Sequence, residues 1–124
     1  MTTLQHSDRR PLPHRRHSWT QKAKVGNQTV YLCCGEYEDG TLGEVFLDAS
    51  KAGSSIRAVL SSLAIFLSLG LQHGVPLTLY VEALRGLNFE PSGDVSGSAH
   101  VMRADSILDW VVRELEAHYL KETT

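Results

Sequence analysis

The chain has 124 residues, of which 42% are apolar and 21% charged, with a formal net charge of −2. This composition predicts one soluble globular domain with a modest core. The long charge-free run at 58–72 has 15 residues, fewer than the ~20 that a membrane-spanning helix needs. No secretory signal is visible, so we expect a cytoplasmic protein without a membrane partner.

Residues 1–19 are basic and contain few apolar side chains. Four arginines, Arg9, Arg10, Arg15 and Arg16, stand against Asp8 alone. We expect a flexible arm ahead of a single domain at 20–124, extended or disordered unless something holds it. Such an arm contacts phosphates, serves as a solvated linker or folds back on its own domain. Nucleic acid is not the expected partner, because the rest of the chain has no basic stripe to continue the contact.

The next segments predict a β-hairpin. Residues 25–35 are rich in β-formers, and Asp39-Gly40 supplies a turn before a second strand that ends near 48. Cys33 and Cys34 are adjacent, which is neither zinc-site nor Cys-x-x-Cys redox spacing. We interpret them as small, half-buried apolar residues rather than as a strained vicinal disulfide.

A long helix follows. It opens at Gly53 or Ser54 and ends near His73, where Gly74 and Pro76 stop it. Its apolar residues recur at helical spacing: Ile56, Val59, Leu60, Leu63, Phe66, Leu67 and Leu71. Because most of the circumference is apolar or small, we expect the central buried helix of the fold. Three serines on it, at 61, 62 and 68, allow close packing with a neighbour.

The C-terminal third contains an ambiguous segment, a loop and a helix. Residues 76–86 fit a helix that starts at Pro76, and they also alternate like a strand. Residues 88–100 are a long Gly- and Ser-rich loop, a kind that tends to be functional or mobile. An amphipathic helix is expected at 105–120, with these residues inward: Leu108, Val111, Val112, Leu115 and Tyr119. We expect Asp109–Arg113 and Glu114–His118 to be surface i,i+4 pairs.

Several stretches, in order and at similar spacing, resemble one known family. The first, "RRPLPHRRHSWTQKA", looks like an Arg-rich linker and the Thr-x-Lys strand that follows it. The others are "EYEDGTLGEVFL", "SKAGSSI", "SLGLQHGVPL", "FEPSG" and "ADSILDWVVREL". Together they resemble the TSCPD domain, the C-terminal domain of adenosylcobalamin-dependent (class II) ribonucleotide reductases. The resemblance implies a helix at 76–86 and an α+β fold. In that fold, a β-hairpin or small antiparallel sheet packs on the long central helix, a shorter helix and the C-terminal amphipathic helix.

The resemblance also limits the function. A reductase needs a large barrel with a radical cysteine, which 124 residues cannot hold. The cysteine pair that follows the domain in the family is missing from "LEAHYLKETT" at the end of this sequence. Before "FEPSG" the family has a His and an Arg, whereas this sequence has Gly86 and Asn88. The roles of those two side chains therefore do not carry over.

The start of the long helix is the first candidate binding site. Lys51, Gly53, Ser54 and Ser55 lie where a strand turns into a helix. A helix start leaves backbone N–H groups unpaired and carries partial positive charge, so it suits a phosphate or carboxylate. The motif lacks the full Gly-x-x-x-x-Gly-Lys-Ser/Thr pattern, so plain N-capping by Ser54 is the competing interpretation.

The stretch "FEPSGD" is the second candidate. Glu90 precedes Pro91 and is held extended, and Ser92 begins a tight turn. It is either a rigid corner whose Glu90 pairs with a cation or the lining of a pocket beside the helix start. Arg57 and Arg85 supply that cation or bind a ligand phosphate themselves.

The sequence offers no catalytic or metal site. His14 and His17 have metal-ligand spacing but no carboxylate or thiol near them, and no serine has a nucleophile-elbow signature. We therefore expect no catalysis, no cofactor and no metal.

Three functional hypotheses remain open. The first is a non-catalytic binding module for a nucleotide or another phosphate-bearing small molecule. The second is a protein-interaction subunit that docks on a ribonucleotide reductase or another large enzyme. The third is an oligomer that sequesters nucleotide signals. A hairpin can cover only one side of the apolar helix, so we also expect a homodimer or a larger homo-oligomer.

Overall fold

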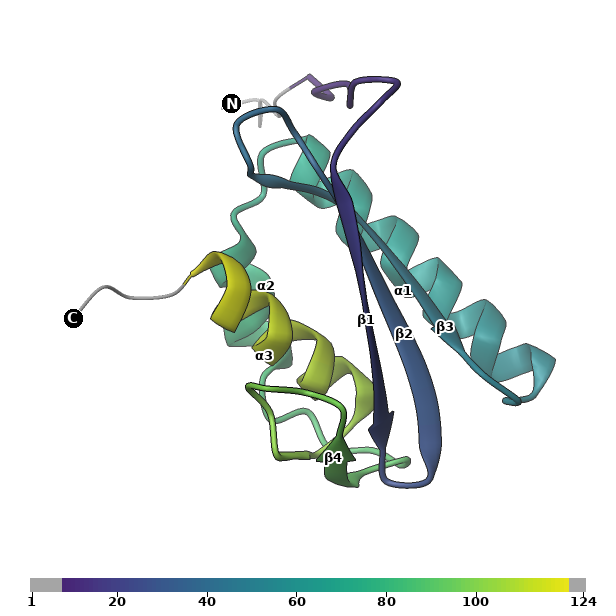
Figure 1. The fold of residues 1–124 in the computed structure, drawn as a ribbon. Helices are drawn as coiled ribbons and strands as arrows, with labels where there is room; N and C mark the ends of the chain where they lie inside the picture. Colours follow the sequence, from purple (N-terminus) through teal and green to yellow (C-terminus); the bar gives the residue numbers. More distant parts are fainter. Residues whose placement is uncertain (1–7, 121–124) are drawn as a thin grey trace, which may run out of the picture.

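The computed structural model describes residues 8–120 and consists of one antiparallel sheet and three helices. The strands lie in the order β3-β2-β1-β4-β5. Their bounds are β1 Ser18–Val25, β2 Gln28–Glu36, β3 Leu42–Ala49, β4 Gly93–Ser96 and β5 Arg103–Ala104. The three long strands form the body of the sheet, and the two short ones extend it at the edge beside β1 (Figure 1). The α+β class is confirmed.

Alternation along the long strands gives the sheet one inward face. The side chains of Val30, Leu32 and Cys34 on β2 point inward, paired with Ala49, Leu47 and Val45 on β3. Residues between them, such as Phe46, point to the opposite face, as the two-residue period of a strand requires. Only one face of the sheet therefore contributes to the core.

Strand β1 was not apparent from the residue pattern, and only the resemblance indicated a strand there. Its pattern is weak because polar residues, among them Lys22 and Lys24, alternate with the inward Ala23 and Val25. It joins β2 through a tight turn at Gly26 and Asn27. Gly26 has a φ of +58°, and a Cβ on it would lie 2.6 Å from the carbonyl oxygen of Ser92, so this position requires glycine.

The second turn matches its prediction. The Asp39-Gly40 pair connects β2 and β3, with Gly40 at a φ of +85°. The amide of Gly40 donates to the carbonyl of Tyr37, and the amide of Tyr37 donates to the carbonyl of Thr41. The Asp-Gly signal was therefore sufficient to locate this hairpin.

The long helix α1, Ser54–Gln72, lies along β3 at the edge of the sheet rather than in the centre of the fold (Figure 1). Four of its residues are buried: Leu60, Ala64, Leu67 and Gln72. The expectation of a central buried helix was wrong. The apolar residues Ile56, Val59 and Phe66 are exposed, because only one stripe of the helix contacts the sheet.

Polar side chains of α1 cover the open edge of β3. The amide of Val45 donates to Oγ of Ser68 over 2.8 Å, and the same hydroxyl donates to the carbonyl of Val45 over 3.1 Å. One turn later, Nε2 of Gln72 donates to the carbonyl of Gly43 over 2.9 Å. These bonds pair edge groups that would otherwise be open to another strand.

The remaining helices are α2, Leu77–Leu84, and α3, Ile107–Tyr119. The ambiguous segment is therefore a helix. Helix α3 begins at Ser106, whose hydroxyl accepts the amide of Asp109 over 3.0 Å as an N-cap. Its residues Trp110, Val111 and Leu115 are fully buried in the single core that also contains the inward face of the sheet.

Residues 8–17 of the predicted arm lie against the domain. The amide of Arg10 donates to the carbonyl of Gln72 over 2.7 Å, and the hydroxyl of Tyr37 donates to the carbonyl of Arg10. Leu12 packs so closely on Gly43 that a Cβ there would lie 2.6 Å from it. This described part of the arm ties the β2–β3 turn to the end of α1, whereas a domain boundary at residue 19 stays a prediction.

We predict that Ser68→Ala lowers the free energy of unfolding by about 1–2 kcal/mol, because it leaves the amide and carbonyl of Val45 without their partner. Urea unfolding followed by circular dichroism measures the change. Ser62→Ala is the matched control, since the hydroxyl of Ser62 bonds only the carbonyl of Ala58 in its own helix. Equal midpoints for the two variants would contradict the role of Ser68 at the β3 edge.

Candidate functional site

The predicted phosphate site at the helix start is open to solvent. Lys51 is exposed and has a φ of +62°, and Gly53 occupies the N-cap position with extended backbone. No side chain caps the helix, so capping by Ser54 was a wrong interpretation: Ser54 is the first helical residue. The first backbone N–H groups therefore have no side-chain partner, as an anion site at this position requires.

Arg57, one turn into the helix, is already paired. Its Nε and one terminal nitrogen donate to the two carboxylate oxygens of Asp48, over 2.8 and 3.0 Å. These bonds, together with the amide of Ala49, hold the pKa of Asp48 below its usual value, and they raise the pKa of Arg57. Arg57 thus points toward β3 and not toward the open helix start.

Glu90 and Ser92 line a separate hollow of about 820 Å³ that also includes Ile56 of α1. Ile56, in the first turn of α1, thus lines the same hollow as the "FEPSGD" loop; a ligand-binding role of this loop stays a prediction. The same hollow contains Asp94 and Arg103, 3.6 Å apart. With two carboxylates and one guanidinium, its lining does not favour an anion.

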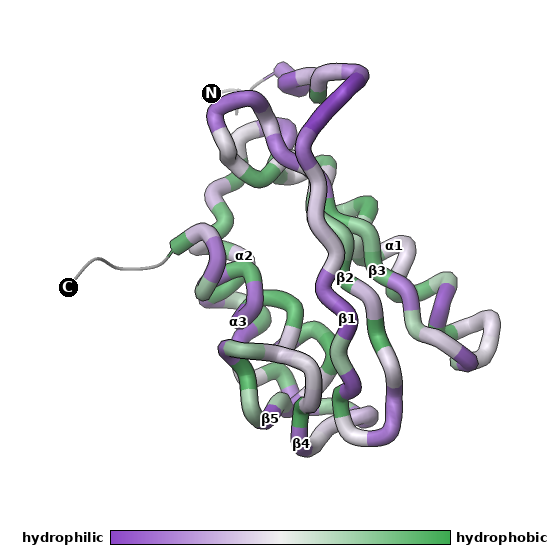
Figure 2. Tube along the Cα trace, in the orientation of Figure 1, coloured by the Kyte–Doolittle hydropathy of each residue, from purple (hydrophilic) through white to green (hydrophobic). Residues whose placement is uncertain are grey.

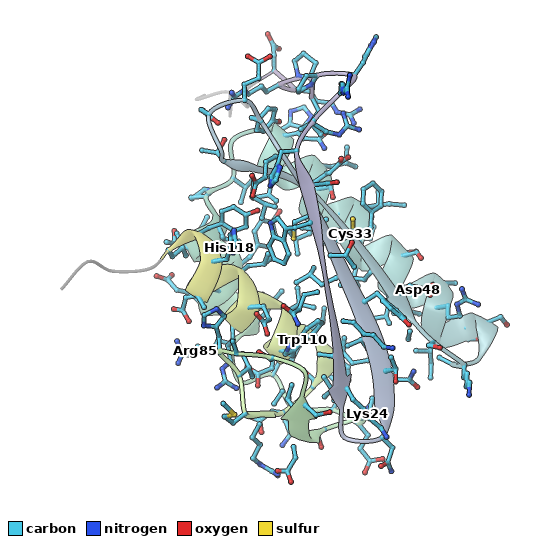
Figure 3. All side chains as sticks on the ribbon, viewed as in Figure 1. Lys24, Cys33, Asp48, Arg85, Trp110 and His118 are labelled. Atoms are coloured by element: carbon cyan, nitrogen blue, oxygen red, sulfur yellow. The ribbon has the colours of Figure 1, made fainter. Side chains whose placement is uncertain are left out.

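Arg85 lies elsewhere. It follows the end of α2, and its terminal nitrogen donates to Glu116 on α3 over 2.8 Å. In Figure 3, Arg85 lies beside α3, whereas Asp48, the partner of Arg57, lies beside the start of α1 on the other side of the sheet. The eight predicted residues thus fall into three groups rather than one constellation, and their binding role stays a prediction.

Sequence reasoning missed a part-buried polar cluster that joins β1, β2 and α3. A carboxylate oxygen of Glu36 accepts the indole N–H of Trp19 over 3.2 Å and the hydroxyl of Tyr119. Burial, followed by this bond to Glu36, raises the pKa of Tyr119. His118 stacks on Trp19 with ring centroids 4.6 Å apart. Strand alternation gave no signal for these contacts, because they join residues far apart in the chain.

Two predicted surface pairs are also different in the structure. Asp109 is buried and accepts the amides of Gly86 and Asp105, each over 2.8 Å, with Arg113 at 3.4 Å. Glu114 is buried and accepts the indole N–H of Trp110 over 3.1 Å. The Asp109–Arg113 pair is therefore present, although its carboxylate is buried rather than on the surface. Glu114 instead bonds Trp110, and His118 lies 4.0 Å from Glu36.

The described residues give no sign of a metal centre. Within 8–120, no group of three or more His, Cys, Asp and Glu side chains is placed to hold an ion. Cys33 and Cys34 are free thiols, and Cys34 is fully buried on the inward face. Burial, with smaller effects from Cys33, Glu36 and Glu114, raises the pKa of Cys34.

The most unusual surface belongs to α1. Eight exposed positions, 55, 56, 58, 59, 62, 65, 66 and 69, fall on one half of the helix at 100° per residue. We call them the α1 outer face. They include Ile56, Val59, Ile65, Phe66 and Leu69, of which Phe66 is 68% exposed. The helix has one charged residue, Arg57, and it lies outside this face. In Figure 2 the α1 tube is mostly green and white.

A solvent-facing half without charge is unusual for a surface helix, which normally carries its charged residues there. By length and composition alone, α1 is also apolar enough to cross a membrane, with a mean hydropathy of 1.6. One such helix is weak evidence of a span, and α1 is hydrogen-bonded to β3 through Ser68 and Gln72. Large exposed apolar surfaces are typical of interaction sites, so the α1 outer face is a candidate interaction surface.

Comparison with protein families identifies the domain. The model of the TSCPD domain matches residues 4–119, nearly the whole chain. The chain belongs to the TSCPD domain family. The resemblance inferred from the sequence motifs is therefore confirmed.

Relatives of this TSCPD domain are named vitamin B12-dependent ribonucleotide reductases. The protein from Agrobacterium fabrum is 51% identical over 113 residues, which is 91% of this chain and 9% of that protein. The Streptomyces coelicolor protein is 38% identical over 112 residues, 90% of this chain and 12% of its own length. The chain thus spans about a tenth of the length of these relatives. No solved structure matches it.

We predict that one thiol of the folded protein reacts with Ellman's reagent at pH 8. Cys33 is partly exposed, whereas Cys34 is buried and its raised pKa disfavours the reactive thiolate. Absorbance of the released thiolate counts the reacting groups, and denaturant should expose the second. Cys33→Ser should remove the native reaction and Cys34→Ser should keep it. Two rapidly reacting thiols in the folded wild type would contradict the burial of Cys34.

Proposed function

We propose that this TSCPD domain is a non-catalytic docking module that packs on a class II ribonucleotide reductase through the α1 outer face. The observation that supports it is the exposed, uncharged half of α1, which contains Phe66 and Ile65. Burying a large apolar side chain stabilises a complex by roughly 1.5–3 kcal/mol when it is fully exposed beforehand. An aromatic residue at the centre of such a surface is a typical anchor.

The choice of partner rests on the relatives. In the Agrobacterium fabrum reductase, about nine tenths of the length lies outside the segment that matches this chain. In such a reductase, the rest of the protein is large enough to cover an apolar face of the matching domain. We infer that the same kind of body is the partner of this chain.

A lipid surface fits the α1 outer face less well. Helices that lie in a membrane interface flank their apolar side with several Lys or Arg residues, which attract anionic lipids. Here the single cation of α1, Arg57, is held by Asp48 through two hydrogen bonds. The flank that would contact headgroups therefore lacks free positive charge.

We predict that Phe66→Glu weakens binding to the Agrobacterium fabrum reductase, purified without its matching segment, by about tenfold or more, because a charge would be buried in an apolar contact. Biolayer interferometry gives the Kd. Met102→Glu is the matched control, since Met102 is 69% exposed but lies outside α1. Both variants should unfold within about 0.5 kcal/mol of the wild type, as expected for surface positions.

Several results would overturn this assignment. No binding of the wild type, or equal binding of Phe66→Glu, would exclude docking through this face. Light scattering that shows a dimer lost in Phe66→Glu, without reductase binding, would make a second copy the occupant. Co-sedimentation with anionic vesicles, lost in the same variant, would make a membrane the occupant.

We also propose, as a second candidate, that the helix start binds the phosphate of a nucleotide. The uncapped first turn after Gly53 and the exposed amine of Lys51 support it. The paired Arg57 and the distant Arg85 leave Lys51 as the principal cation. An oligomer that sequesters nucleotides would use the same contact without turnover.

Lys51→Ala should then weaken binding of nucleoside triphosphates by about fivefold to tenfold, because it removes one charged phosphate contact. Isothermal titration calorimetry measures the affinity, and Lys24→Ala, an exposed lysine on β1, is the control. Recovery of intact nucleotide after denaturation would agree with binding without turnover. Equal affinities for wild type and Lys51→Ala would exclude this site.

A further inference from the structure

A hollow of about 310 Å³ lies between α1 and β3, directly beside the α1 outer face. Its exposed lining residues include Phe46 of β3 together with Ile65 and Leu69 of α1. Its buried lining residues include Val45 and Ala64. The hollow is thus mainly apolar, and its remaining lining residues are polar: Arg9, Glu44, Ser61, Ser68 and Gln72. Ile65 and Leu69 belong both to this hollow and to the α1 outer face, so the two surfaces are continuous.

Four of the five polar side chains that line the hollow are bonded within the chain, and the fifth, Ser61, is exposed. Ser68 exchanges two hydrogen bonds with Val45, and Gln72 bonds Gly43 and Arg9. The carboxylate of Glu44 accepts Nε of Arg16 over 2.6 Å. A polar ligand that bonded Ser68, Gln72 or Glu44 would compete with these bonds, whereas an apolar group would not. The chemistry of the hollow therefore favours an apolar occupant.

The hollow is held open by the fold. The bonds of Ser68 and Gln72 fix α1 against the β3 edge at one end, and the bidentate Arg57–Asp48 pair joins α1 to β3 at the other. A pocket whose walls are fixed before binding loses little conformational freedom when it is filled. Pockets of this kind receive the anchor side chains that contribute most to protein interfaces.

The outer face of α1 is too small to form a complete protein interface by itself. A 19-residue helix is roughly 28 Å long, and a specific interface covers about 800 Å² on each partner. One helix face is a narrow strip, so a stable partner must cover neighbouring surface as well. Phe46, which is 55% exposed across the hollow from Ile65, is the nearest apolar surface of that kind.

We propose that this hollow receives one large apolar side chain, such as Leu, Met or Phe, from the reductase that covers the α1 outer face. The inference rests on the proposed docking function and adds the chemistry of the partner's anchor. The anchor lies between Phe46 and Ile65, with the rest of the partner surface on Phe66 and Val59. Specificity then comes from the hollow, and general apolar contact comes from the outer face.

The first test uses a probe and not the reductase. N-acetyl-phenylalanine amide or N-acetyl-leucine amide, titrated into the ¹⁵N-labelled full chain, should give saturable shifts at the amides of Val45 and Leu47, with affinity in the millimolar range expected of so small a ligand. N-acetyl-glutamine amide should give none. Absence of saturable shifts with both apolar probes would overturn the proposal.

The second test separates the hollow from the outer face. Ser61 lines the hollow and is exposed, so Ser61→Phe should fill it while the chain still folds. It should abolish the probe shifts, whereas Ser62→Phe, which lies outside the hollow, should keep them. Ser61→Phe should also weaken reductase binding by about tenfold or more.

The two proposals fail in different ways. Reductase binding that is lost in Phe66→Glu but unchanged in Ser61→Phe would overturn the anchor in the hollow and keep docking through the outer face. No reductase binding by the wild type would overturn both. If Ser61→Phe does not fold, Ile65→Ala removes a wall of the hollow and should reduce the probe affinity at least threefold. Unchanged probe affinity in that variant would also overturn the proposal.

Discussion

The hydrogen bonds between α1 and the edge of β3 determine which surface of α1 stays exposed to solvent. An edge strand must be covered or made unattractive to other strands, and here Ser68 and Gln72 cover it by bonding the backbone of Val45 and Gly43. To reach that edge, α1 must lie at the side of the sheet. A helix in that position can bury only one stripe, and the rest of its apolar surface remains outside.

The sequence could predict the elements better than their burial. The spacing of apolar residues correctly located α1 and α3, and the Asp39-Gly40 pair located a hairpin. Apolar periodicity cannot say which side of a helix meets the sheet when apolar residues occur all round it. The side of α1 that meets the sheet is the side that contains Ser68, whose hydroxyl bonds the backbone of Val45. That contact is tertiary, so the helix propensity of serine does not predict it. Strand β1 was missed because its outward residues are polar and its inward ones small.

The candidate site could be predicted only in part, for a similar reason. The helix start at Lys51 and Gly53 is a local feature, and the structure has it where the sequence indicated. Arg57 and Arg85 were grouped with it by charge alone. In the fold, Arg57 pairs with Asp48 and Arg85 with Glu116, and neither pair could be predicted because the partners are distant in the sequence. Buried Glu114 shows the same limit, since spacing paired it with His118, whereas its partner in the fold is the indole of Trp110. Charge and spacing identify candidates, but only the fold decides which donors are free.

The distribution of charge supports the proposal that the α1 outer face packs on a protein. The single cation of the helix is neutralised by Asp48, and two arginines of the described N-terminal segment bond the domain, Arg16 to Glu44 and Arg9 to Gln72. Arg9 lines the hollow beside the outer face, where it is bonded to Gln72. With this one cation there, long-range attraction to an anionic surface would contribute little to orienting the molecule by this side. Apolar burial and the shape of the hollow beside Phe46 remain as the recognition elements. Both require a partner with a fixed, complementary surface, which a folded protein has and a lipid layer lacks.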